Sequence, residues 1–145
     1  MSALPITYRG AVYPWHCDHM GHMNVAWYVG KFDEATWNLF NMVGLSPSYL
    51  RSSGRGVAAV DQHTKYINEL HAGDVVTIRS HLLSLEGKKI RFQHRMFNGE
   101  TNELAASTDL LGICMDTAIR KSCDFSDPVI QAAQAMIAEQ GGGLR

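Results

Sequence analysis

Hydrophobic side chains recur at three- and four-residue spacing along residues 25–43, which is the pattern of a helix with one buried face. The recurring positions are Val25, Tyr28, Val29, Phe32, Ala35, Thr36, Leu39, Phe40 and Val43. Asn24 precedes this run and is a favoured N-cap, whereas Gly44 follows it and suits the position beyond the C-cap. The sequence therefore predicts one long helix with both of its ends marked.

Elsewhere the pattern alternates with a period of two, which is typical of strands. Expected strands cover residues 6–13, 57–68, 74–85, 89–97 and 103–116. The segments EGKK and NGET lie between the last three strands and predict hairpin turns. We expect the four strands after the helix to form an antiparallel meander. The segment before them, residues 44–56, is expected to be a turn-rich connector that is most mobile at 52–56.

The C-terminal part of the chain carries the signals of a short helix. Ser126, Asp127 and Pro128 are a cap, an acid and a proline in the favoured order, which predicts a helix over 126–139, with 141–145 frayed. One long helix against a curved antiparallel sheet is an α+β architecture. With 145 residues, the chain is expected to form a single domain, 1–145.

Charge and cysteine usage narrow the function classes. The formal net charge of −1 gives no reason to expect a nucleic acid or a membrane as partner. Three cysteines without CxxC spacing argue against a disulfide framework. The first ten residues lack the features of a secretory signal, and no apolar run approaches the roughly 20 residues of a membrane span. We therefore expect a cytoplasmic protein.

Residues 16–24, HCDHMGHMN, place an unusual density of polar side chains directly before the long helix. One interpretation is a metal site, because histidine, cysteine and aspartate are all competent ligands. However, the spacing HxxH lacks the four-residue offset that puts two histidines on one helical face. No second ligand cluster follows, because the remaining histidines are scattered. Metal binding is therefore a less favoured alternative, and no metal or other cofactor is expected. A plain polar loop whose Asn24 only caps the helix is a further alternative.

A third interpretation uses the helix itself. The first turn of a helix offers unpaired N–H groups and a partial positive charge, which can stabilise an oxyanion. Asp18 lies six residues before the N-cap, and Gly21 allows the bend that would return it to the helix mouth. A carboxylate there can attack a carbonyl or activate a water. His22 and Asn24 could orient the reacting groups, so the loop is also a minimal acyl-transfer site.

The segment 13–35, YPWHCDHMGHMNVAWYVGKFDEA, resembles the opening of hotdog-fold acyl-CoA thioesterases of the 4-hydroxybenzoyl-CoA thioesterase type. That family shows an aspartate, a glycine three residues on and a tyrosine ten residues on, and these are Asp18, Gly21 and Tyr28 here. The segment GHMN at 21–24 is similar to the GHVN of many bacterial acyl-CoA thioesterases and plant acyl-ACP thioesterases. The order of expected elements also resembles the hotdog fold over residues 8–124.

The resemblance implies an enzyme that hydrolyses an acyl-CoA thioester, with coenzyme A present only as part of the substrate. Asp18 would be the nucleophile or general base, and the backbone N–H of Val25 would hold the oxyanion. His22 matches a histidine that the plant enzymes use, but Met20 stands where their pattern has an asparagine. An acyl-CoA-binding or dehydratase-type protein on the same fold is the alternative.

In many hotdog proteins the active site lies between two subunits, which implies a dimer or tetramer. The strand segment 57–70 of one subunit would then line the acyl pocket opposite the Asp18 of another. Further candidates for contact with the acyl group are Gly21, Trp27, Tyr28 and His63, and candidates for the CoA phosphates are Arg55, Arg91 and Arg95. For His63 and the arginines, a solvent-exposed position without a function is the favoured alternative.

Overall fold

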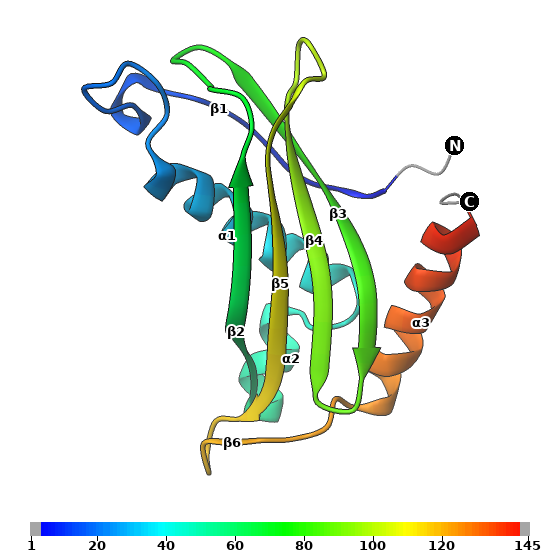
Figure 1. Cartoon of the computed structure of the whole chain (residues 1–145). Helices are drawn as coiled ribbons and strands as arrows, with labels where there is room; N and C mark the ends of the chain where they lie inside the picture. The colour runs from blue at the N-terminus through cyan, green and yellow to red at the C-terminus, as the bar shows by residue number, and fades with distance from the viewer. Residues whose placement is uncertain (1–3, 143–145) are drawn as a thin grey trace.

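The computed structural model describes residues 4–142 and shows a curved antiparallel sheet packed against one long helix (Figure 1). The strands are β1 (Ile6–Ala11), β2 (Arg55–Tyr66), β3 (Val75–Glu86), β4 (Lys89–Asn98), β5 (Leu104–Asp116) and β6 (Lys121–Ser122). The helices are α1 (Val25–Met42), α2 (Pro47–Ser53) and α3 (Asp127–Gly142), with a 3-10 turn at Pro14–His16. The α+β prediction is confirmed, and residues 143–145 of the expected frayed end lie outside the described residues.

The order of the strands in the sheet is β1-β3-β4-β5-β2, and the two-residue β6 pairs with β5. The expected meander of four strands is therefore wrong in one respect. Strands β3, β4 and β5 follow one another through tight turns, but β2 pairs with β5 at the far edge instead of with β3. Because β4 and β5 lie between β2 and β3 in the sheet, the segment that joins β2 to β3 crosses over the end of the sheet instead of forming a hairpin.

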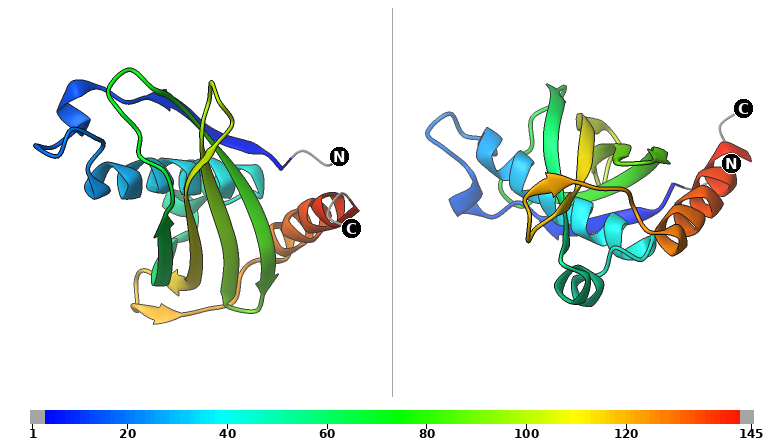
Figure 2. Two further views of the ribbon diagram at one scale, coloured as in Figure 1. Left: turned by 45° about the horizontal axis from the view of Figure 1, so that its top comes forward. Right: turned by 90° about the horizontal axis from the view of Figure 1, so that it is seen from below.

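Helix α1 forms where the spacing predicted it. The Asn24 side chain accepts a hydrogen bond from Ala26 N at 2.9 Å, and Gly44 has a φ of 88°, a left-handed conformation that favours glycine. The side chains that face the sheet are buried, and Ala35 and Leu39 are completely inaccessible to solvent. Figure 2 shows the helix lying across the strands, so its N-terminal end emerges beside the ends of β1 and β2.

The connector of residues 44–56, expected to be turn-rich, contains a helix. Residues Pro47–Ser53 form α2, capped by Ser46, whose hydroxyl accepts a hydrogen bond from Tyr49 N at 3.2 Å. Gly54 ends the helix in a left-handed conformation with a φ of 68°. The cap, proline and glycine were all present in the sequence. No helix within residues 4–142 has both the length and the apolar character that a membrane crossing requires.

Helix α3 covers the part of β3 that extends beyond β1 (Figure 1). The side-chain amide of Gln140 donates to Leu82 O at 2.8 Å and accepts from Leu82 N at 3.0 Å. Gln140 is 3% exposed, so this pair replaces the two hydrogen bonds that a neighbouring strand would have made. The edge of β3 is thereby satisfied within the chain.

Side chains of α1 bind two carbonyl oxygens at the outer edge of β1. Asn38 Nδ2 donates to Thr7 O at 2.6 Å, and Lys31 Nζ donates to Ala11 O at 3.2 Å. Within the described chain, β1 and β2 are the two edge strands in this strand order, and no helix side chain donates a hydrogen bond to the outer edge of β2.

A network of buried, hydrogen-bonded polar side chains links α1 to the sheet, with His94 at its centre. Thr36 Oγ1 donates to Phe32 O at 3.0 Å, so its contact of 2.8 Å with His94 Nε2 requires the ring nitrogen to carry the proton. His94 Nδ1 then accepts from Ser80 Oγ at 2.6 Å. Both ring nitrogens are satisfied in the neutral form, and burial lowers the pKa of His94 to about 3.

This histidine predicts a dependence of stability on pH. Its pKa is about 3 in the folded chain against 6.5 in the unfolded chain, so the unfolded state binds the extra proton between these values. The contribution of His94 is therefore complete above pH 6.5 and is lost as the pH falls. We expect the free energy of unfolding to drop by about 2 kcal/mol between pH 7.5 and pH 5 from this group alone.

Urea unfolding of the wild type and of His94→Asn at the two pH values measures this contribution. The variant is expected to be less stable at pH 7.5 and to lose less stability on acidification. His63→Asn, at an exposed position of β2, is the control and should keep the wild-type pH dependence. An equal loss of stability in wild type and His94→Asn would contradict the prediction.

Candidate active site

The loop before α1 folds back on itself and brings Asp18 to the helix mouth. Cys17 and Met23 form an isolated antiparallel bridge, and Gly21 N donates to Asp18 O at 3.0 Å to close a tight turn. Gly21 has a φ of 88°, so the bend that the sequence predicted requires this glycine. Met23 N donates to Leu70 O at 2.7 Å, which ties the loop to the segment before β3.

The Asp18 carboxylate is held by one hydrogen bond to each oxygen. Oδ1 accepts from Met20 N at 2.8 Å, and Oδ2 accepts from Asn24 Nδ2 at 2.8 Å. Because the other end of the same amide caps α1 at Ala26, Asn24 joins the carboxylate to the first turn of the helix. A carboxylate oxygen can accept more than one hydrogen bond, so both oxygens can still bind a water or face a carbonyl.

The same contacts control the ionisation of Asp18. The hydrogen bond from Asn24, followed by that from the Met20 backbone, lowers the pKa of the carboxyl below its ordinary value, and the charges of His22 and His19 add to the effect. Because the pKa of Asp18 is lowered, its carboxyl group is ionised at neutral pH. The residue is only half-buried, so the carboxylate is accessible.

Removal of the Asn24 amide is expected to raise the pKa of Asp18. In Asn24→Ala the carboxylate loses the largest of the interactions that favour its charged form. Carbon-detected NMR titration of the Asp18 carboxyl should show its midpoint at higher pH than in the wild type. The lost N-cap should also cost about 1 kcal/mol of stability.

A second cap provides a matched control for this variant. Ser46→Ala removes the cap of α2, which contacts Tyr49 N and not Asp18. It should lower the stability comparably but leave the Asp18 titration unchanged. An Asp18 midpoint that does not move in Asn24→Ala would rule out the control of its charge by Asn24.

The backbone N–H of Val25 lies in the first turn of α1 and has no hydrogen-bond acceptor among the described residues. His22 does not join Asp18 there. Its ring nitrogens lie 3.4 Å from Met23 O and 3.5 Å from Glu69 Oε2. The structure thus places Asp18, Asn24 and Val25 together, with His22 on the side that faces β2.

A cavity of about 160 Å³ opens beside the helix mouth. It is lined by His22, Met23, Val25, Tyr28, Tyr66, Ile67, Asn68 and Glu69. Tyr28 is 4% exposed and meets Tyr66 edge to face, with 5.1 Å between ring centroids. Burial raises the pKa of the Tyr28 hydroxyl, so it is neutral, and it donates a hydrogen bond to Asn68 O at 3.5 Å.

Two other candidates for acyl contact lie outside this cavity. Trp27 packs against the ring of His16 at 4.3 Å between centroids, on another side of α1. His63 is exposed on the edge strand β2, in the solvent-exposed position that was the favoured alternative for it. Within one chain neither residue joins Asp18.

The three arginines differ in their availability. Arg55 is the first residue of β2 instead of part of a mobile connector, and its Nη1 lies 3.2 Å from Asp116 Oδ2 in an ion pair. Arg91 and Arg95 point outward from β4 on the exposed face of the sheet, where alternate residues are buried. Within residues 4–142, no three histidine, cysteine, aspartate or glutamate side chains converge as metal ligands would.

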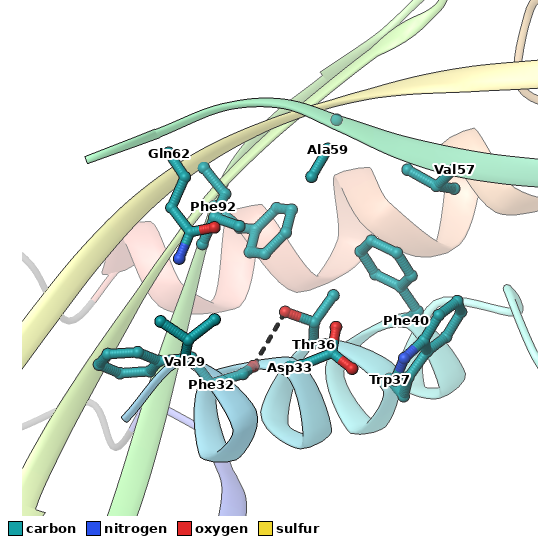
Figure 3. Close-up of a pocket in the computed structure, with 12 residues that line it drawn as sticks. Val29, Phe32, Asp33, Thr36, Trp37, Phe40, Val57, Ala59, Gln62 and Phe92 are labelled. Carbon is teal, nitrogen blue, oxygen red and sulfur yellow. Dashed lines mark hydrogen bonds between the residues drawn. The ribbon is translucent and has the colours of Figure 1, made fainter. Parts of the chain in front are cut away.

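A second pocket, which we call the α1–β2 pocket, lies farther along α1 and was not predicted (Figure 3). Its volume is about 110 Å³, and its lining residues are Val29, Phe32, Asp33, Thr36, Trp37, Phe40, Val57, Ala59, Gln62, Phe92, Leu110 and Gly112. Asp33 and Trp37 follow Val29 at four-residue spacing, so one exposed stripe of the helix forms one wall. An acid within such a stripe, beside a tryptophan, was the available sequence signal.

Similar proteins place this chain in a family. An L-carnitine dehydrogenase/betainyl-CoA thioesterase of Ruegeria pomeroyi is 32% identical over 88% of the chain, and the chain spans about a quarter of the length of the curated relatives of this name. A betainyl-CoA thioesterase of Pseudomonas aeruginosa is 28% identical over 94% of this chain and 86% of its own length.

A Staphylococcus aureus protein solved in complex with CoA has a TM-score of 0.88 at 19% identity, over 96% of this chain and 88% of that one. This likeness confirms the expected hotdog fold. The family profile of the thioesterase-like superfamily matches residues 12–134, which is most of the chain. The resemblance found around Asp18 is thereby confirmed, and the chain belongs to the thioesterase-like superfamily.

Proposed function

We propose that this protein hydrolyses acyl-CoA thioesters to a free acid and CoA, with Asp18 as the group that delivers the attacking oxygen. The observation that carries the proposal is the ionised Asp18 carboxylate, joined through Asn24 to the open first turn of α1. The family membership of the chain supports this reaction class.

In the proposed reaction, the thioester carbonyl lies at the helix mouth with its oxygen toward the Val25 N–H. Asp18 either attacks the carbonyl carbon directly or takes a proton from a water that attacks it. The negative charge that develops on the carbonyl oxygen is stabilised by the N–H group and the positive end of the helix. The carbon–sulfur bond then breaks and CoA leaves as a thiolate. In the direct route, water afterwards hydrolyses the anhydride between the acyl group and Asp18. By either route one water is consumed, its oxygen enters the free acid and a proton from it converts the thiolate to the thiol.

Other residues have supporting roles in this proposal. Gly21 and Asn24 position the carboxylate, and Tyr28 walls the cavity beside the mouth. Arg91 and Arg95 are the candidates for the CoA phosphates, while Arg55 already has Asp116 as its partner. Coenzyme A enters as part of the substrate.

The relatives named as betainyl-CoA thioesterases identify the first acyl group to assay. A betainyl group is an acetyl unit that carries a trimethylammonium. Purified protein should release free thiol from at least one member of a panel of betainyl-, short-chain, branched and aromatic acyl-CoAs. If no member of the panel releases thiol above the uncatalysed rate, the proposed function is wrong.

A further inference from the structure

We propose that the α1–β2 pocket binds the positively charged head of the acyl group, in particular a quaternary ammonium, with Asp33 and the ring of Trp37 as its specificity-determining contacts. This inference rests on the proposed thioesterase function and adds the substrate class to it.

The walls of the pocket are suited to a methylated cation. Aromatic side chains of α1 and β4 follow one another around it: Trp37 meets Phe40 at 5.8 Å between centroids, and Phe40 meets Phe92 at 5.4 Å. Aromatic faces attract cations, and quaternary ammonium groups are commonly bound in this way because they cannot donate hydrogen bonds. The aliphatic wall on the opposite side, from Val57 and Ala59 of β2, can contact the methyl groups (Figure 3).

The charge of the pocket has the sign that such a ligand requires. Asp33 is the acidic residue of the lining, and none of the lining residues is basic. Among the described residues, its carboxylate has no hydrogen-bond or ion-pair partner. Figure 3 shows it between Thr36 and Trp37, directed toward the space below β2. The carboxylate attracts a cation by its charge, and the aromatic rings beside it suit a cation whose surface consists of methyl groups.

Two other polar side chains of the lining have hydrogen-bond partners. Thr36 Oγ1 contacts Phe32 O and His94 Nε2, and Gln62 Nε2 donates to Thr64 Oγ1 at 3.5 Å. The carboxylate of Asp33 is the charged group of the lining, and it remains available to a ligand. A neutral acyl group would gain nothing from this charge, which gives a basis for selectivity.

The short length of the betainyl group determines which Asp18 site can act together with the pocket. Val25 and Asp33 are eight residues apart on α1, which is about 12 Å along the helix axis. In a betainyl group the nitrogen lies only about 2.5 Å from the carbonyl carbon, as in an amino acid backbone. One helix mouth and the pocket of the same chain therefore cannot hold the two ends of this group. We thus place the head group in the pocket of one copy and the carbonyl at the Asp18 site of a second copy.

The test compares betainyl-CoA with 3,3-dimethylbutyryl-CoA, in which a carbon replaces the charged nitrogen and the shape is kept. Wild-type protein should prefer the cationic thioester in kcat/KM. In Asp33→Asn this preference should fall by about tenfold or more, mainly through KM, while the rate with the neutral thioester changes little. Trp37→Leu should also reduce the preference.

The neighbouring carboxylate of Glu34 provides a matched control, because it is exposed on α1 and does not line the pocket. Glu34→Gln should keep the wild-type preference. An equal effect of Asp33→Asn on both thioesters, or an equal effect of Glu34→Gln and Asp33→Asn, would overturn the inference.

Failure of this inference can be distinguished from failure of the proposed function. Thiol release from other acyl-CoAs without any preference for the cation would refute the cation site and leave the thioesterase function standing. Equilibrium binding of the two thioesters to Asp18→Asn repeats the comparison without turnover. Equal affinities in that variant would refute the cation site, even if no acyl-CoA were hydrolysed.

Discussion

Asp18→Asn is expected to lower kcat for acyl-CoA hydrolysis by about 10²- to 10⁴-fold, the range typical of a lost general base. Asparagine has nearly the same shape as aspartate but can neither attack the carbonyl as an anion nor accept a proton from water. The thermal unfolding midpoint should change little, because Asp18 lies in a loop outside the packed core.

The measurement is single-turnover and steady-state release of thiol from the best substrate of the panel. His19→Asn, at the exposed neighbouring position, is the control and should retain activity close to that of the wild type. Hydrolysis by Asp18→Asn at the wild-type rate would show that another group delivers the oxygen.

Asp18→Asn and Asp33→Lys are each expected to hydrolyse betainyl-CoA poorly alone but to regain activity when they are combined in one dimer. If the helix mouth of one copy works with the α1–β2 pocket of another, a mixed dimer of Asp18→Asn and Asp33→Lys carries both defects in one site. Its second site is then intact. Asp33→Lys is chosen because its like charge should repel the trimethylammonium more strongly than the neutral asparagine.

Random pairing in a 1:1 co-expression makes half of the dimers mixed, so activity on betainyl-CoA should return to about one quarter of the wild-type value. A mixture of Asp18→Asn with Asp18→Ala has the same site damaged in every subunit and is the control. If the first mixture exceeds neither its parents nor this control, the two-copy arrangement is wrong.

The arrangement of the residues around Asp18 could be predicted from the sequence because the sequence features that determine it are local. The N-cap Asn24, the bend at Gly21 and the six-residue offset of Asp18 are all properties of one short segment. The structure places them as those properties predict. Helix α1 was predictable for a similar reason, because its buried face repeats over five turns without interruption.

The errors concern contacts between distant segments. Alternation identified β2 as a strand but gave no information about its neighbour, and the pairing with β5 depends on the crossover after Tyr66. His94 alternates correctly with its neighbours, but only the structure shows that Thr36 and Ser80 satisfy both of its nitrogens. Asp33 was missed because a charged residue on an exposed helical stripe looks like ordinary solvent-facing surface.

The two edges of the sheet differ in how readily a strand of another molecule could pair with them. One side is occupied from within, by Asn38 and Lys31 against β1 and by Gln140 against β3. If two copies paired through β2, both β2 edges would be used and the combined sheet would end at the two β1 strands. The contacts of Asn38, Lys31 and Gln140 would then hinder the addition of a further strand and the growth of an extended β-filament.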